Sequence, residues 1–125
     1  MKKITIIMEE IEIRMTATLN DSMTAEKIYE ALPFESIVNI WGDEIYFNIP
    51  VSLDQAPDAR AEVEVGELGY WPVGSAFCIF FGPTPVSKDE KPRAASPVNI
   101  FGNVDGDTKI LKEVPGGTLV KVTRQ

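Results

Sequence analysis

The stretch Gly66–Pro85, GELGYWPVGSAFCIFFGPTP, holds the densest apolar run of the chain. Within it, Ala76–Phe81 is a run of apolar residues without a charge, bounded by Gly74 and by Gly82-Pro83. A run of this length is too short for a buried helix and is typical of a strand that is covered on both faces. We therefore predict that this stretch is the buried spine of a β-barrel.

Aromatic side chains flank the same run. Tyr70 and Trp71 stand just before it, between a glycine and a proline, and Phe81 ends it. Aromatic residues at the entrance to a central strand are typical of a pocket wall, although a structural corner has the same composition. We predict that Tyr70, Trp71 and Phe81 share an aromatic surface beside a cleft.

The strands expected on either side of this stretch follow from alternation. Ile11–Leu19 places apolar side chains on one face and polar ones on the other, and it pairs with Lys3–Met8 in a hairpin. The period changes to 3.6 between Ser22 and Leu32, which predicts an amphipathic helix with Asp21 as its N-cap and Pro33 as its stop.

The rest of the chain adds short elements of the same kinds. Further strands are expected at Ser36–Trp41, Glu44–Ile49, Ala61–Val65, Val98–Val104 and Thr118–Thr123, with a short helix near Asp107–Glu113. About eight strands and two short helices, without βαβ alternation, predict a mainly β fold. We expect a closed antiparallel barrel whose ends the helices cap.

Composition narrows the partners. The chain has 125 residues, 44% hydrophobic and 25% charged, which are ordinary values for one globular domain spanning residues 1–125. Its 19 Asp and Glu against 12 Lys and Arg create a field that repels phosphate backbones and anionic lipids. No segment has the length of a membrane span. We expect neither nucleic acid nor a membrane as a partner, and the oligomeric state is left open.

Cysteine and histidine usage limits the chemistry. Cys78 is the only cysteine, so it forms no internal disulfide and is expected to pack as a small hydrophobe. The chain has no histidine, hence no Cys/His metal set, and no phosphate-binding glycine loop. We expect no metal and no cofactor. The start Met1–Ile4 lacks a signal sequence, which fits a reducing, cytoplasmic location.

Polar candidates lie on the strand that follows the Gly42-Asp43 turn. Glu44, Tyr46 and Asn48 share one face by alternation, and a carboxylate, a phenol and an amide in one row predict a polar pocket lining. The alternative is a solvated outer face.

A long excursion leaves directly from the central strand. Residues Pro83–Pro97 contain several prolines and a charged cluster, which predicts a mobile segment. As a lid over the cleft it would bring Arg93 or Lys91 to an anionic group; the alternative is a plain connector.

The order of these elements resembles a known family. GDEIYF at Gly42–Phe47, YWPVGSAFCIFFGPTP at Tyr70–Pro85 and IFGNV at Ile100–Val104 resemble small prokaryotic cyclophilin-like proteins of uncharacterised function. The resemblance covers nearly the whole chain and implies a cyclophilin-like β-barrel.

The same resemblance argues against the family's catalysis. Cyclophilins isomerise X-Pro bonds with an arginine, a histidine, a phenylalanine and a glutamine, and their signature strand reads Phe-His-Arg. The nearest stretch here is Tyr46–Pro50, with Ala76 in place of the glutamine and Cys78 in place of a pocket phenylalanine. Only Arg60 and Arg93, outside the motif, remain to reach a cleft.

Without the arginine donor, little in the sequence lowers the barrier of about 18–20 kcal/mol to amide rotation, somewhat less at proline. We therefore expect a domain that binds a small molecule or peptide in an aromatic-lined cleft. The alternatives are an isomerase with an atypical active site and, third, an unrecognised hydrolytic or lyase activity.

Overall fold

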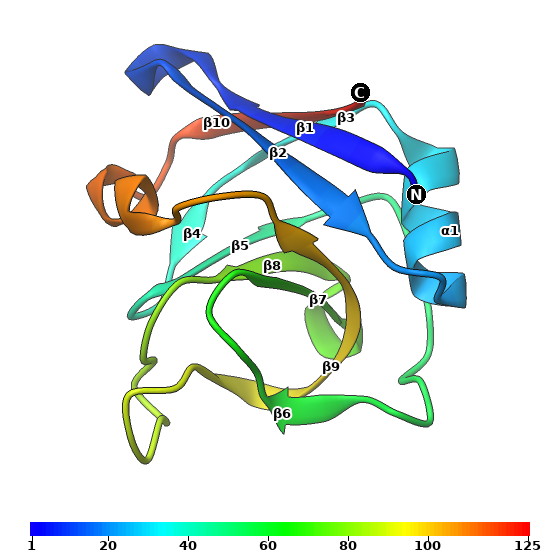
Figure 1. The fold of residues 1–125 in the computed structure, drawn as a ribbon, viewed down its shortest axis with the longest axis vertical. Helices are drawn as coiled ribbons and strands as arrows, with labels where there is room; N and C mark the ends of the chain where they lie inside the picture. The colour runs from blue at the N-terminus through cyan, green and yellow to red at the C-terminus, as the bar shows by residue number, and fades with distance from the viewer.

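The computed structural model describes residues 1–125 and contains ten antiparallel strands and one α-helix (Figure 1). The strands are β1 (Lys3–Met8), β2 (Ile13–Leu19), β3 (Phe34–Ile37), β4 (Asn39–Ile40), β5 (Glu44–Asn48), β6 (Arg60–Glu62), β7 (Glu67–Trp71), β8 (Ala76–Phe80), β9 (Arg93–Val104) and β10 (Leu119–Arg124). The helix is α1 (Met23–Ala31), and three short 3-10 helices are η1 (Glu9–Ile11), η2 (Pro72–Gly74) and η3 (Lys109–Glu113). None of the helices is long and apolar enough to cross a membrane.

The sheet curves around a central core but is not closed by hydrogen bonds (Figure 1). The strand order is β3-β10-β1-β2-β9-β7-β8-β5-β4, with β6 paired to β9. The end strands β3 and β4 are separated in the chain only by Val38, whose backbone bonds to Gly117 and Thr118. The predicted mainly β antiparallel fold is confirmed, whereas the predicted closure is not.

Ten strands replace the predicted eight for two reasons. The expected strand Ser36–Trp41 breaks at Val38, so that its halves pair with different partners, β10 and β5. The stretch around Tyr70, predicted only as the entrance to a strand, is itself strand β7 between β8 and β9.

Strand β8 is buried on both faces, as its apolar run predicts. Its inward side chains, including Phe77, join a main core of 27 residues, in which Phe77 stacks on Phe47 at 4.8 Å between ring centroids. Its outward side chains belong to a second, smaller core, here called the outer cluster. The outer cluster consists of Val63, Ala76, Cys78, Phe80, Ala94 and Val98.

The helix predictions need two corrections. Helix α1 has Ser22 rather than Asp21 as its N-cap, because the Ser22 hydroxyl oxygen accepts the Ala25 N–H at 3.1 Å. Met23, the apolar residue that begins α1, is exposed and does not join the buried face of the predicted amphipathic helix. The second expected helix is only the 3-10 turn η3.

One buried side chain ties the loop before β6 to the sheet. Asn99 of β9 is buried, and its Oδ1 accepts the Ala56 N–H at 2.8 Å. Its Nδ2 donates to the Asp54 carbonyl at 3.0 Å and to the Thr24 hydroxyl at 3.2 Å. These bonds join α1, β9 and the loop without leaving the amide unsatisfied.

Candidate functional site

A cavity of about 240 Å³ opens on the outward face of the sheet, beside the outer cluster. It is called the outer cavity below. Its lining residues are Trp41, Glu44, Tyr46, Trp71, Ala94, Ala95 and Val98, from β5, β7, β9 and the turn before β5. Glu44 is the one carboxylic acid among them.

Strand alternation determines which face of the sheet each β5 side chain points to. Ile45 and Phe47 belong to the main core, so Glu44 and Tyr46 point to the opposite face, where the outer cavity lies. The cross-strand partner of Tyr46 on β8 is Cys78.

A tight turn brings Trp41 to the same place. The Trp41 N–H donates to the Glu44 carbonyl at 3.0 Å, and the Glu44 N–H donates to the Trp41 carbonyl at 3.2 Å. Gly42, inside this turn, has φ +60, and a Cβ there would stand 2.9 Å from the Thr84 Cα atom. The turn therefore needs glycine both for its conformation and for its close approach to the next segment.

Glu44 is the unusual group of the cavity. The residue is only 5% exposed, and its Oε1 atom has no hydrogen-bond partner. Burial raises the pKa of the Glu44 carboxyl from an ordinary value of 4.5 to about 7, and the neighbouring Cys78 thiol offsets part of that rise. Burial also raises the pKa of the Cys78 thiol, so this thiol is neutral at physiological pH. The cavity therefore contains a carboxyl group that is close to half protonated near neutral pH.

Trp71 is held rigidly in the cavity wall. Its Nε1–H donates to the Ser96 hydroxyl at 2.6 Å, and its ring meets the Tyr46 ring at 6.4 Å between centroids with an interplanar angle of 75°. The indole lies against Gly74, where a Cβ would stand 2.8 Å from the ring. Asn48 donates from Nδ2 to the Gly74 carbonyl at 2.6 Å. Asn48 thus holds the turn under Trp71 and does not line the cavity.

Two predicted aromatic site residues lie elsewhere. Tyr70 is fully buried in the main core, where its hydroxyl donates to the Val51 carbonyl at 2.7 Å and accepts the Leu53 N–H at 3.1 Å. Phe81 is buried in the same core. Because successive side chains of a strand point to opposite faces, Tyr70 and Trp71 cannot share one surface. The predicted three-residue aromatic surface is wrong, and only its Trp71 reaches the cavity.

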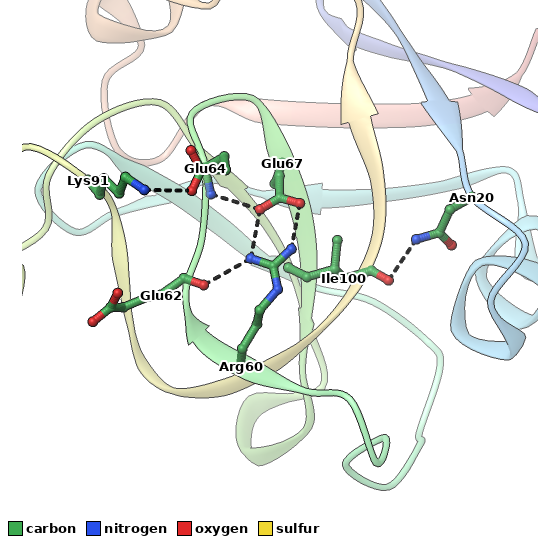
Figure 2. A network of polar contacts seen from close by, with 7 residues as sticks. All are labelled: Asn20, Arg60, Glu62, Glu64, Glu67, Lys91 and Ile100. Carbon is green, nitrogen blue, oxygen red and sulfur yellow. Dashed lines mark hydrogen bonds and ion pairs between the residues drawn. The ribbon is translucent and has the colours of Figure 1, made fainter.

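Arg60, one of the two arginines expected to reach a cleft, begins strand β6 and is held there by a bidentate ion pair with Glu67. Arg60 donates to both carboxylate oxygens of Glu67, at 3.0 and 2.8 Å, and to the Glu62 carbonyl at 2.9 Å (Figure 2). The Glu64 N–H donates to Glu67 as well, at 2.7 Å. Hydrogen bonding to Glu67 raises the pKa of Arg60 above its usual value. This network braces β6 against β7 and does not line the outer cavity.

The predicted excursion is shorter than the sequence indicates. Strand β9 begins at Arg93, so residues 93–97 are strand, and Arg93 itself pairs with Glu62 at 3.0 Å. Lys91 pairs with Glu64 at 3.2 Å. Within residues 83–92 the Ser87 hydroxyl bonds to backbone groups at both ends, the Thr84 N–H and the Lys91 carbonyl. Neither cation lines the outer cavity.

Sequence reasoning missed part of the lining. Ala94 and Ala95 lie within the predicted excursion Pro83–Pro97, and small side chains carry no signal for a pocket wall. Trp41 also lines the cavity and was not among the predicted site residues. Its position close to Glu44 in the chain, and the presence of only two tryptophans, could have identified it.

Comparison with known proteins agrees with this architecture. The model of the family described as cyclophilin-like matches residues 2–123. The chain belongs to the cyclophilin-like family. This cyclophilin-like chain is also similar to the solution structure of a hypothetical protein from Archaeoglobus fulgidus. The TM-score is 0.83 with 37% identity, and the match covers 99% of this chain and 95% of that one. No curated protein matches.

Strand β8 contributes residues to the outer cluster beside the cavity. Ala76 and Cys78, where the resemblance implies a glutamine and a phenylalanine, lie on β8 in the outer cluster, against which Tyr46 and Trp71 pack. No arginine lines the cavity, and no group of three or more His, Cys, Asp or Glu side chains is placed to hold a metal ion. The chemistry that this site offers is an aromatic wall and one buried carboxyl group.

Proposed function

We propose that this cyclophilin-like chain binds a small molecule, or an apolar side chain of a peptide, in the outer cavity. The observation that carries the proposal is the Glu44 carboxyl group, which lines the cavity, is 5% exposed and has one oxygen, Oε1, without a hydrogen-bond partner. A buried polar atom without a hydrogen bond costs about 1–3 kcal/mol. A ligand whose polar group meets the Glu44 carboxyl from the cavity would offset part of that cost.

The size and lining of the outer cavity also support binding. Its volume of about 240 Å³ is somewhat below the range of about 300–1,000 Å³ of typical ligand pockets, which suits a small ligand or one side chain. Apolar walls with few polar groups are typical of ligand pockets, in which the apolar surface supplies affinity and the polar group orients the ligand. Here the aromatic rings would have the first role and Glu44 the second.

Binding fits the site better than isomerisation does. An isomerase with an atypical active site would need Arg60 or Arg93 as the amide donor, and each is paired with a glutamate outside the outer cavity. Recruiting Arg60 would leave Glu67, which is only 11% exposed, without its counterion. The Arg93–Glu62 pair is more exposed and would break at little cost, so Arg93 is the arginine that an atypical isomerase would use.

The test uses a variant that fills the cavity from its rim. Ala95 lines the cavity yet is exposed, so Ala95→Phe is expected to block the cavity without disturbing the core. Asn103→Phe, at an exposed position of the same strand, is the matched control. Both tryptophans of the chain line the cavity, so their indole N–H resonances report on it directly.

A fragment library of aromatic compounds, alcohols, amines and proline-containing dipeptides would be screened by NMR against all three proteins. We expect fragments that shift the indole resonances in the wild type and in Asn103→Phe but not in Ala95→Phe. Fragments that bind Ala95→Phe equally well, or no binding fragment at all, would refute the proposal.

A further inference from the structure

We propose that the ligand of the outer cavity is a substituted ammonium cation, such as a quaternary methylammonium group, held between the three aromatic rings and the carboxylate of Glu44. This inference rests on the proposed function and specifies the ligand class. Three observations support it: the aromatic rings that line the cavity, the Glu44 carboxylate among the lining residues, and the absence of basic side chains from the lining.

Three aromatic side chains line the outer cavity. The Tyr46 and Trp71 rings stand nearly perpendicular, at 75° and 6.4 Å, so they present aromatic surface to the cavity from two directions. Trp41 adds a third ring. Aromatic rings attract cations through their quadrupole, most strongly for tryptophan and where water is excluded, and cages of such rings bind quaternary ammonium groups.

The charges at the site favour a cation over an anion. Glu44 is the lining carboxylate, and no lining residue is basic. The nearby cations Arg93 and Lys91 pair with Glu62 and Glu64 instead of entering the cavity. An anionic ligand would face an unpaired carboxylate, whereas a bound ammonium would supply the counterion that Glu44 lacks. The net charge of −7 also attracts cations at long range.

A bound cation would be coupled to the proton on Glu44. The Cys78 thiol of β8 acts on the Glu44 carboxyl, and the Tyr46 phenol of its own strand lines the same cavity; neither carries a positive charge. An ammonium ion favours the carboxylate form, so binding releases a proton wherever Glu44 is protonated in the empty cavity. With a pKa of about 7, affinity is expected to be about tenfold weaker at pH 6 than at pH 8.

The decisive probe pair is choline and 3,3-dimethyl-1-butanol, its uncharged carbon isostere. The two have nearly the same shape, so calorimetric titration of each into the wild type separates charge from fit. At pH 8 we expect choline to bind at least about tenfold more tightly than the alcohol. Glu44→Gln keeps the size of the side chain and is expected to remove most of this preference and all of its pH dependence. Ala95→Phe is expected to abolish binding, and Asn103→Phe to retain it.

The outcomes separate the two proposals. Equal affinity for choline and the alcohol would overturn the cation inference while leaving ligand binding intact. The same holds if only the alcohol binds, or if choline binds Glu44→Gln as tightly as the wild type. If choline fails to bind while fragments of other classes occupy the cavity, the cation inference again fails alone. If nothing occupies the cavity, both proposals fail.

Discussion

Replacing Glu44 by glutamine is expected to stabilise the folded protein at high pH more than at low pH. The carboxyl is 5% exposed, and burial raises its pKa from 4.5 to about 7. Between these values the folded state binds a proton that the unfolded state has lost, so wild-type stability falls as pH rises through this window. Above pH 7 the folded protein contains a charged, poorly solvated carboxylate, which the glutamine variant does not have.

The magnitude follows from the shift. Each pKa unit corresponds to about 1.4 kcal/mol, and most of the interval from 4.5 to 7 lies between pH 5 and pH 8. The stability gained by Glu44→Gln should therefore be about 2–3 kcal/mol larger at pH 8 than at pH 5. For a chain of this size that corresponds to a difference in Tm of roughly 10 °C.

Urea unfolding of the wild type and of Glu44→Gln at the two pH values measures this quantity. Other titrating groups are present in both proteins, so their contributions cancel in the difference. One of them is Asp105, whose pKa is lowered by hydrogen bonds from Thr18, Lys3 and Thr16. Glu113→Gln, at an exposed position, is the control and should change stability equally little at both pH values.

A gain that is the same at pH 5 and pH 8 would refute the reasoning. It would mean that water or a cation reaches the Glu44 carboxylate in the folded protein, so that burial does not penalise its charge. The case for an unsatisfied polar group in the outer cavity would then be lost as well.

Two further predictions concern the stability of the fold and proline isomerisation. Asn99→Ala should lower the free energy of unfolding by about 1–3 kcal/mol, because it removes hydrogen bonds to the buried Thr24 hydroxyl and to backbone groups of the less buried Asp54 and Ala56; urea unfolding beside the exposed Asn103→Ala checks this, and equal effects would argue against it. Proline peptides, which exchange between cis and trans in tens of seconds unaided, should exchange no faster with the protein, as followed by NMR exchange spectroscopy. Acceleration that disappears in Arg60→Ala or Arg93→Ala would instead support an atypical isomerase.

Local patterns in the sequence determined the identity of most elements. Alternation in Ile13–Leu19 gives a strand with one buried face, and the uninterrupted apolar run at Ala76–Phe80 gives a strand buried on both. These patterns are readable because the period of a strand is a property of neighbouring residues. The same alternation places Glu44 and Tyr46 together, and the structure keeps them together in the outer cavity.

The composition of the site was decided by the tertiary structure. Which face of β7 points outward depends on its pairing with β8 and β9, and this register sends Tyr70 to the core and Trp71 to the cavity. The cavity beside Glu44 is also lined by Ala94 and Ala95, about fifty residues further along the chain. Register and desolvation arise between segments that are distant in sequence, so no local pattern encodes which carboxyl group lies unpaired beside an aromatic wall.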